Sequence, residues 1–435
     1  MGRSRPGHGN PIRQRPGTPL KVPSYALDTL KSLWHGGQTV TGSPTISYPD
    51  SDSPGDLLHL IRIGRARTRG ELGQVTGLAR STVAQRIDTL KAAGLVVELD
   101  EAAPSTGGRP PSLLGFNADA GLILVADLGA THSRVAVSNL LAEPMAETSA
   151  EIDIDLGPSE ILAWVEETFI SLLSEIGRPA SDVRGIGIGL PGPVDFARGM
   201  AVNPPIMAGW HLFGVADHLR SHYDVPVLVD NDVNIMALGE YWVMEPKVED
   251  FVFIKVGTGI GSGLILGGSL HRGAKGAAGD LGHVRASNDE AHCRCGNNGC
   301  LEASAGGAAI AAKLRESGLE AADSRDVVKL VQEGDREATR SVRAAGRLIG
   351  QVLASTVNLL NPALIMMGGD LAKAEAQLLA GIREVVYQRS TTLSTTDLQI
   401  TVSSLGDRAG ITGAAAMVIE HLFTPSVIDH VLAGG

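Results

Sequence analysis

The period of apolar positions changes several times along the chain, and each change predicts a different kind of segment. Residues 1–53 are rich in Gly, Pro, Ser and Arg and have no apolar period, which predicts a disordered tail. Apolar residues then recur at helical spacing in 57–61 and in 80–93, which predicts two helices. Thr68 and Glu71 form the capping box of a further helix between them. Order is therefore expected to begin near residue 54.

Two short strand patterns, 95–97 and 113–116, follow these helices, with GGRPP at 107–111 as the predicted hairpin tip. Three helices and a hairpin predict a winged helix-turn-helix over 54–117. Such a unit lays the first side chains of its third helix against base edges of double-stranded DNA. The candidate DNA contacts are Arg80, Ser81, Thr82, Gln85, Arg86 and, reaching phosphate or the minor groove from the tip, Arg109. Winged helices also bind proteins, and the residues leave that alternative open.

From Gly121 onward the pattern becomes that of an α/β protein. A strand, a turn and a second strand run from LILVADLG to VAVS, and FIKVGTGIGSGLIL repeats this pattern about 130 residues later. The backbone amides of such turns can surround a phosphate. A lone Gly-rich turn often serves strand geometry alone, but two in similar settings predict two related half-domains that face each other. Further on, 337–358 has one apolar face and predicts a long core helix, extending toward a subunit interface.

Charge divides the chain at about the same place as the apolar pattern. Residues 1–112 contain 14 Lys or Arg and 9 Asp or Glu, a net charge of +5, which leaves −16 for the rest of a chain whose total is −11. A basic front suits a small DNA-binding unit, although a solvated basic tail has a similar charge. No apolar run approaches the roughly 18 residues of a spanning helix, and no secretory signal is present. We therefore expect a cytoplasmic protein without membrane contact.

All three cysteines lie within eight residues, at Cys293, Cys295 and Cys300, and His283 stands ten residues before the first. Three thiolates and an imidazole form a ligand set that tetrahedral Zn²⁺ prefers, so the spacing predicts a structural zinc knuckle. His292 is a competing ligand, but it adjoins Cys293 and would crowd the loop. The alternative is three buried, inert thiols, which fits poorly with a polar, Gly-rich segment.

The stretch GAAGDLGH, followed by CxCGxxGCLE, resembles the signature of the ROK family of repressors, open reading frames and sugar kinases. The resemblance extends over nearly the whole chain. It implies a duplicated actin-like (RNase H-like) ATPase or sugar kinase fold over 118–435, with halves of about 118–245 and 246–435. The front also resembles ROK repressors, whose recognition helix opens with GLSxxTV. Here it opens with GLARSTV, so Ala79 replaces a serine N-cap at a cost of about 1 kcal/mol.

The resemblance implies a sugar site. By position in the family motifs, its contacts are Asn203, Asn231, Asp232, Asp280, His283 and Glu302, with Asp232 the catalytic base of the kinase members. Asp280 is one methylene shorter than the commoner glutamate, which puts the identity of the sugar in doubt. The residues also allow Asp230 or Asp232 to cap the next helix instead, with Asp230 nearer the cap. Zinc at His283 would order Asp280 and Glu302 around the same sugar.

A nucleotide site is implied less completely. Its candidates are Asp127, Gly129, Thr131, Gly257, Thr258, Gly259, Gly368 and Gly369. The family pattern DxGGTK is changed here to DLGATH, with Ala130 for a glycine and His132 for a lysine. Gly368 and Gly369 suit helix packing on a sheet as well as an adenosine site. ATP and Mg²⁺ are therefore expected only if kinase activity is retained.

These implications together predict a sugar-responsive transcriptional regulator, a repressor of carbohydrate metabolism genes, that binds an operator in double-stranded DNA. Its effector would be a sugar or sugar phosphate, and its assembly a homodimer or a dimer of dimers. The main alternative is an ATP-dependent kinase of a hexose or N-acetylhexosamine that also binds DNA. A DNA-binding scaffold with an inactive pocket is the third.

Overall fold

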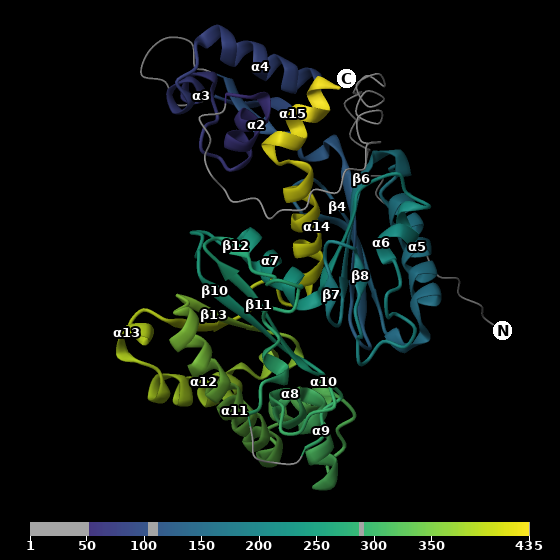
Figure 1. The fold of residues 1–435 in the computed structure, drawn as a ribbon, viewed down its shortest axis with the longest axis vertical. Helices are drawn as coiled ribbons and strands as arrows, with labels where there is room; N and C mark the ends of the chain where they lie inside the picture. The colour runs from purple at the N-terminus through teal and green to yellow at the C-terminus, as the bar shows by residue number, and fades with distance from the viewer. Residues whose placement is uncertain (1–51, 103–111, 287–290, 435) are drawn as a thin grey trace, which may run out of the picture.

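The computed structural model describes residues 52–102, 112–286 and 291–434. The predicted tail, apart from its last two residues, and the predicted hairpin tip with Arg109 lie outside the described residues. Figure 1 shows the described chain as a small N-terminal unit above two larger α/β bodies, with helix α14 between them.

The N-terminal unit, residues 54–116, is called the head. Its elements are α2 (Pro54–Arg62), α3 (Arg69–Thr76), α4 (Arg80–Ala92) and the antiparallel strands β1 (Val96–Ala102) and β2 (Ser112–Phe116). The predicted capping box of Thr68 and Glu71 starts α3, and a second box of Ser53 and Asp56 starts α2. Helix α4 follows Ala79, which makes no side-chain cap. The first amides of α4 thus lack the hydrogen bond that a serine would supply.

The two larger bodies are built around sheets of the same topology. The first sheet has the order β5-β4-β3-β6-β9 and the second the order β12-β11-β10-β13-β14. In each sheet the central strand, β3 or β10, pairs antiparallel with its hairpin partner, β4 or β11. On its other side it pairs in parallel with β6 or β13. The strands of the first sheet are β3 (Leu122–Leu128), β4 (Ser133–Ser138), β5 (Pro144–Ala150), β6 (Val183–Leu190) and β9 (Val227–Asn231). Those of the second are β10 (Phe251–Val256), β11 (Ile260–Leu266), β12 (Ser269–Leu270), β13 (Leu364–Gly368) and β14 (Gln399–Val402). The predicted duplication of an α/β half is confirmed.

Helices cover both sheets, and two short strands, β7 (Val194–Asp195) and β8 (Met200–Ala201), form a separate hairpin. The first half contains α5 (Pro158–Glu175), α6 (Val215–Arg220) and α7 (Asp232–Val243). The second contains α8 (Leu301–Ala305), α9 (Gly307–Glu316), α10 (Ser324–Gln332), α11 (Arg336–Leu360), α12 (Glu375–Arg389) and α13 (Thr392–Thr395), then α14 (Ala409–Leu422) and α15 (Pro425–Ala433). The single-turn elements η4 (Leu281–His283) and η5 (Asp370–Ala374) lie in connections. Helix α11 is the predicted long helix, and its apolar face is buried.

Helix α14 packs against the first sheet and α7 at very short distances. A Cβ atom on Gly413 would lie 1.6 Å from the carbonyl oxygen of Ile235, and one on Gly239 would lie 2.1 Å from that of Ala409. Glycine is therefore required on both helices where they cross. The α7–α14 pair forms a tightly packed centre between the two halves.

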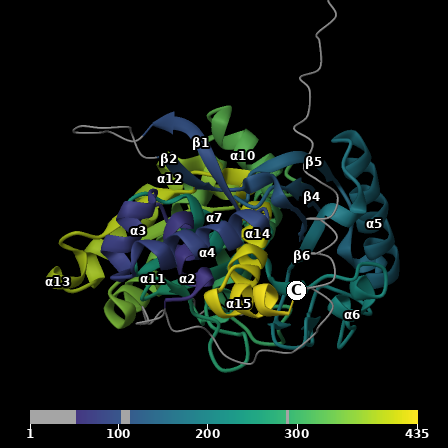
Figure 2. The same cartoon turned by 90° about the horizontal axis from the view of Figure 1, so that it is seen from above.

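The head is joined to the same centre through α15. The rings of Phe116 and Phe423 meet edge to face at 5.1 Å, and the Arg62 guanidinium lies 5.0 Å from the Phe423 ring centre. The backbone amide of Gly55 donates to Asp429 in α15. Buried residues of the head and of α14 belong to one apolar cluster. Figure 2 shows α15 lying beside the helices of the head.

Within the described residues no single helix is long and apolar enough to cross a membrane. One bent pair, 406–422 with 425–433, meets the length and composition criteria across a 54° bend.

Candidate functional site

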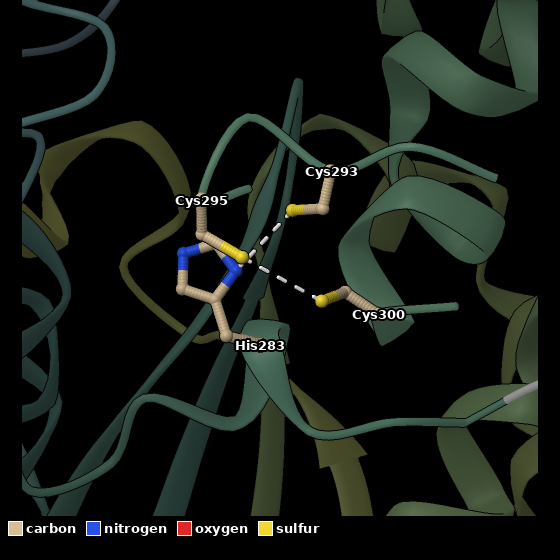
Figure 3. Close-up of side chains that lie close together, drawn as sticks. All are labelled: His283, Cys293, Cys295 and Cys300. Carbon is tan, nitrogen blue, oxygen red and sulfur yellow. Dashed lines mark hydrogen bonds between the residues drawn. The ribbon is translucent and has the colours of Figure 1, made fainter. Parts of the chain in front are cut away.

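The three cysteines and His283 converge on one point, as Figure 3 shows. Their ligand atoms all lie within 4.8 Å of one another. The Cys293 sulfur is 3.4 Å from Nδ1 of His283, and the sulfurs of Cys295 and Cys300 are 3.7 Å apart. Inert core thiols would not be expected to gather around an imidazole. This cluster can hold a metal ion in a four-coordinate N/S site.

The local backbone explains why these side chains meet. Gly296 and Gly299 have φ angles of 90° and 74°, the left-handed conformation that lets the chain reverse twice within eight residues. The competing ligand His292 hydrogen-bonds through Nδ1 to Asn298 at 2.7 Å, and only His283 belongs to the cluster. A backbone hydrogen bond at Asn297 lowers the pKa of the Cys295 thiol to about 7, whereas burial raises the pKa of the Cys293 and Cys300 thiols.

The junction of β9 with α7 is dense with hydrogen bonds. Asn231, rather than Asp230 or Asp232, is the cap of α7: its side-chain oxygen accepts from the amides of Val233 and Asn234. The expectation of a cap nearer Asp230 is therefore wrong, because Asn231 lies two and three residues before these donors and its side-chain oxygen accepts from both. Asn231 also donates to the carbonyl oxygen of Gly192 at 3.0 Å, so it holds the loop after β6.

Two cations that sequence reasoning missed hold the aspartates of this junction. Lys255 of β10 donates to Oδ2 of Asp232 at 2.6 Å, and Arg272 donates to Oδ2 of Asp230 at 2.7 Å. Both aspartates are buried. Each pair joins the first half to the second. No local sequence motif predicts these two ion pairs. The one available signal is a lysine within an otherwise apolar strand, FIKV.

Glu302 supports the second Gly-rich turn. Its Oε2 atom accepts from the amide of Ile260 at 3.0 Å, and a Cβ on Gly259 would lie 2.2 Å from that oxygen. Gly257 closes the turn by donating its amide to Gly259, and its carbonyl accepts from Gly307 at the start of α9. Glu302 thus connects the loop of 257–259 with the Cys knuckle that precedes it in the chain.

Two other predicted sugar contacts are exposed. Asn203 has a φ of 47°, and its amide donates to the His211 ring at 3.1 Å. Asp280 precedes η4 and makes no side-chain cap. Among the described residues, no hydrogen bond joins either side chain to Asp232 or Glu302. Both exposed side chains are therefore available to a ligand.

The first turn, at the end of β3, differs from the second. Burial raises the pKa of the Asp127 carboxyl to about 6, against an opposing effect of Lys255. Its Oδ1 atom is buried and has no hydrogen-bond partner in the described chain. A Cβ on Gly410 would lie 1.9 Å from Oδ2, so the first turn of α14 covers this carboxyl. Gly129 and Thr131 follow in the turn, with Thr131 exposed.

Gly368 is the last residue of β13, and Gly369 follows it. A Cβ on Gly368 would lie 2.3 Å from the Phe253 ring. Gly369 has a φ of 80°, and a Cβ there would lie 2.7 Å from the carbonyl oxygen of Val256. These contacts supply a packing reason for both glycines.

On the head, the predicted DNA contacts occupy the first turns of α4. Arg80, Ser81 and Gln85 are exposed and Thr82 is partly buried. Arg86 is different: its side chain is 20% exposed and its guanidinium is paired with Asp52 at 3.2 Å. Arg109 lies outside the described residues.

Two halves of the same sheet topology, a tightly crossed helix pair between them and a Cys₃His cluster beside a Gly-rich turn define a protein of the sugar-kinase-like class. The model of the ROK family matches residues 123–421, and the chain belongs to this family. The chain is 30% identical to a xylose repressor of Caldicellulosiruptor bescii over 85% of this chain and 95% of that protein.

Among solved structures, it is similar to a ROK family transcriptional regulator described as a homolog of the E. coli MLC protein, with a TM-score of 0.74 and 26% identity, covering 88% of this chain and 98% of that one. It is also similar to a ROK family glucokinase of Streptomyces griseus in complex with glucose and AMPPNP. There the TM-score is 0.59 and the identity 26%, over 68% of this chain and 99% of the glucokinase.

Proposed function

We propose that this protein is a sugar-responsive, DNA-binding transcriptional regulator that represses genes of carbohydrate metabolism. The observation that carries the proposal is α14, which touches Asp127 at its first turn and leads through Phe423 and α15 to the head. The relatives support it, because the similarity to the xylose repressor extends over 85% of the chain, whereas the glucokinase covers 68%. The chain is longer than the part that the glucokinase matches. A DNA-binding unit, proposed at 54–117, would account for the additional residues.

The mechanism follows from this continuity. Helix α14 crosses α7, whose first residue is Asp232, and the crossing leaves no space for a side chain at Gly413. A sugar that draws the two halves together shifts α7 relative to the second sheet, and α14 transmits the shift to α15 and the head. The effect on DNA affinity equals the difference in sugar affinity between the two arrangements.

The effector site is proposed between the halves. Its contacts are Asn203, Asn231, Asp232, Asp280, His283 and Glu302. These are carboxylate, amide and imidazole groups, which pair with the hydroxyl groups of a sugar. A relative named as a xylose repressor makes xylose the first sugar to test, with glucose and an N-acetylhexosamine beside it.

The metal of the Cys₃His cluster is proposed to be Zn²⁺. Three thiolates and one imidazole in a closed tetrahedral set select zinc and leave no open position for catalysis, so its role is structural. By fixing His283 and the knuckle before Glu302, zinc would hold two sugar contacts at once.

DNA is proposed to bind at the N-terminal end of α4, through Arg80, Ser81, Thr82, Gln85 and Arg86, with Arg109 from the hairpin. The amides at the start of α4 lack a side-chain cap and are suited to a phosphate oxygen. Arg86 would exchange Asp52 for DNA. A dimer presents two such heads to two half-sites.

A sugar kinase remains the second candidate, because Asp232 and the turn of Gly257, Thr258 and Gly259 are retained and a glucokinase is among the similar structures. Only that function would use ATP and Mg²⁺ at Asp127, Gly129, Thr131, Gly368 and Gly369.

The decisive experiment combines sugar binding, phosphate transfer and DNA binding on the full chain. Thermal unfolding is followed with xylose, glucose and N-acetylglucosamine, each also tested as an acceptor of phosphate from ATP. A duplex selected from a random-sequence pool then reports DNA affinity with and without the stabilising sugar. We expect one sugar to stabilise the protein and to weaken DNA binding, without turnover.

Variants locate the two sites. Asp232→Asn should remove the sugar response and leave DNA affinity in place. Gln85→Ala and Arg86→Ala should each weaken binding of the selected duplex by about tenfold, which is the order of one lost base contact. Duplex affinity that ignores every sugar while phosphate transfer proceeds and is lost in Asp232→Asn would establish the kinase instead.

A further inference from the structure

The ammonium group of Lys255 stands among the carboxylates of the candidate site. Lys255 lies one residue before the end of β10 in the second half, and its Nζ is 2.6 Å from Oδ2 of Asp232 at the start of α7 in the first half. The side chains are 26% and 7% exposed, so water screens this pair only weakly. Oδ1 of Asp232 meanwhile accepts from Asn231 and from the Val233 amide. Three donors therefore hold this carboxylate, which leaves one of its roughly four lone-pair positions, on Oδ2, for a ligand.

Two more carboxylates act on the same ammonium. Burial lowers the pKa of Lys255, but Asp232, Asp127 and, more weakly, Asp370 outweigh it and raise the pKa to about 12. These aspartates come from α7, β3 and η5, three elements that meet around the end of β10. Asp370 is also held by Ser324 and Lys373. Lys255 is thus the cation that neutralises a carboxylate cluster built from both halves.

The magnesium nucleotide implied by the kinase members does not fit this arrangement. Magnesium needs an octahedron of oxygens, drawn from carboxylates, phosphates and water, at about 2.1 Å. Here one carboxylate is bound to an ammonium and another, Asp127, is covered by Gly410. A divalent ion entering the cluster would meet a fixed positive charge in a poorly screened place.

We propose that Lys255 is a positioning residue that holds Asp232 as a permanently paired acceptor, so that the cleft binds a sugar hydroxyl without accepting its proton and excludes a magnesium nucleotide. This inference rests on the proposed function, in which the cleft senses sugar rather than phosphorylating it. A general base must direct a lone pair at the proton it accepts, and the ammonium takes one of the two lone pairs on Oδ2.

The test compares the wild-type chain with Lys255→Met, Lys255→Gln and Lys255→Arg. Binding of Mg²⁺ with a non-hydrolysable ATP analogue is measured by calorimetry, and sugar binding by thermal shift. We expect no nucleotide binding by the wild type or Lys255→Arg and at least a tenfold tighter apparent affinity in Lys255→Met. Lys255→Gln keeps hydrogen-bond donors for Asp232 without the charge and should behave like Lys255→Met, which guards against a Met variant that does not fold.

Two outcomes overturn the inference: wild-type affinity for the magnesium nucleotide equal to that of folded Met and Gln variants, or phosphate transfer by the wild type. Failure of the proposed function has a different readout. In that case no sugar changes the affinity for the duplex, whatever the nucleotide measurements show.

A second cluster lies on α5, on α6 and on the turn after α6, in the first half. Oε1 of Glu166 in α5 is 2.8 Å from Nδ1 of His222 and 3.5 Å from Nε2 of His218 in α6. The three ligand atoms lie within 4.8 Å of one another. His218 lies in α6 and His222 lies in the turn two residues after its end, and both rings reach Oε1 of Glu166. Two imidazoles and a carboxylate are the donors of three-ligand zinc sites with a fourth position for water.

A row of rings connects this cluster to a proposed sugar loop. Phe213 packs at 6.4 Å from Trp210 and 5.8 Å from His218, and His218 packs at 5.4 Å from His222. Trp210 is fully buried and follows Asn203 by seven residues. We infer that Glu166, His218 and His222 form a second site for a divalent transition metal of the zinc class, which fixes α6 and the loop before it to α5.

Cobalt distinguishes the two sites. Co²⁺ bound by thiolates has a strong sulfur charge-transfer absorption, which a His₂Glu site lacks. We expect two cobalt ions per chain in the wild type and one in His218→Gln/His222→Gln, with the thiolate absorption unchanged. His430→Gln, an exposed histidine on α15, is the matched control and should retain two. One ion per chain in the wild type, or two in the double variant, overturns the assignment.

Discussion

The hairpins β3–β4 and β10–β11 occupy equivalent places in the two halves, yet their turns contact different things. The turn after β3 presents Asp127, with a buried and unpaired oxygen, to the first turn of α14. The turn after β10 is held by Glu302 and by the start of α9. One hairpin thus adjoins the helix that leads to the head, and the other adjoins the Cys₃His cluster.

The difference shows how a duplicated fold can separate two tasks. A turn packed against a helix transmits displacement, because packed contacts with no free space cannot deform gradually. A turn held by Glu302, which directly follows the Cys knuckle, is fixed in place and suits a ligand site. Under the proposed function, the second half holds one wall of the effector site in place, and the first half adjoins the helix that reports the presence of the sugar.

The largest expected effect is on the knuckle side. Cys300→Ser should lower the free energy of unfolding by about 4–5 kcal/mol or more, the scale of a lost structural metal, because a buried ligand is removed. Urea unfolding and metal content per chain measure it. The sugar-dependent thermal shift should disappear in the same variant.

His292→Ala is the matched control for this substitution, because His292 pairs with Asn298 and not with the cluster. It should retain the metal and the unfolding midpoint of the wild type. A Cys300→Ser protein with unchanged stability and sugar response would show that the knuckle does not hold the second hairpin in place.

The next effect is on the first hairpin. Gly410→Ala should lower stability by about 3 kcal/mol, the upper part of the range for overpacking, because the new Cβ would lie 1.9 Å from Asp127 Oδ2. Adding Asp127→Ala should recover much of the loss, since it removes the atom that clashes. Gly73→Ala, in α3, is the control: its Cβ would meet nothing closer than 3.5 Å. Equal losses in the single and double variants would mean that α14 does not press on this carboxyl.

Much of this architecture could be predicted from local sequence. The capping box at Thr68 starts a helix where expected, and Gly77, with a φ of 73°, ends it. The two hairpins and the long helix α11 also follow from apolar period and glycine placement. The Cys₃His cluster is predictable because all of its ligands lie within 18 residues and their spacing already demands a tight turn.

The features that could not be predicted depend on how distant segments meet. Lys255 and Asp232 are 23 residues apart, and Gly55 and Asp429 are 374 apart. The period of apolar residues cannot predict such pairs, because the two members of each pair lie on different parts of the fold. The cap of α7 is hard to predict for a related reason. Asn231 and both flanking aspartates are all good caps, and local sequence does not show that Arg272 and Lys255 pair with the aspartates.

The smallest expected effect tests the charge of the first hairpin. The pKa of Asp127 is raised from 3.8 to about 6 by burial, so the folded protein binds this proton more tightly than the unfolded chain does. The contribution of this carboxyl to stability therefore falls as the pH rises from about 4 to about 6, and the cost is fully present at pH 7. A shift of this size corresponds to at most about 3 kcal/mol, and we expect about 1–2 after relaxation around the ionised group.

Asp127→Asn should remove that cost, because an amide has the shape of the protonated acid and no charge to bury. The variant should be more stable than the wild type at pH 7.5 and nearly equal to it at pH 4, as measured by urea unfolding at both values. Asp397→Asn, on an exposed loop, should leave the difference between the two pH values unchanged. If Asp127→Asn instead destabilises the protein at pH 7.5, the ionised carboxylate is a required partner of Lys255. The two hairpins would then share one charge cluster, and the separation of their tasks would lie only in what each turn packs against.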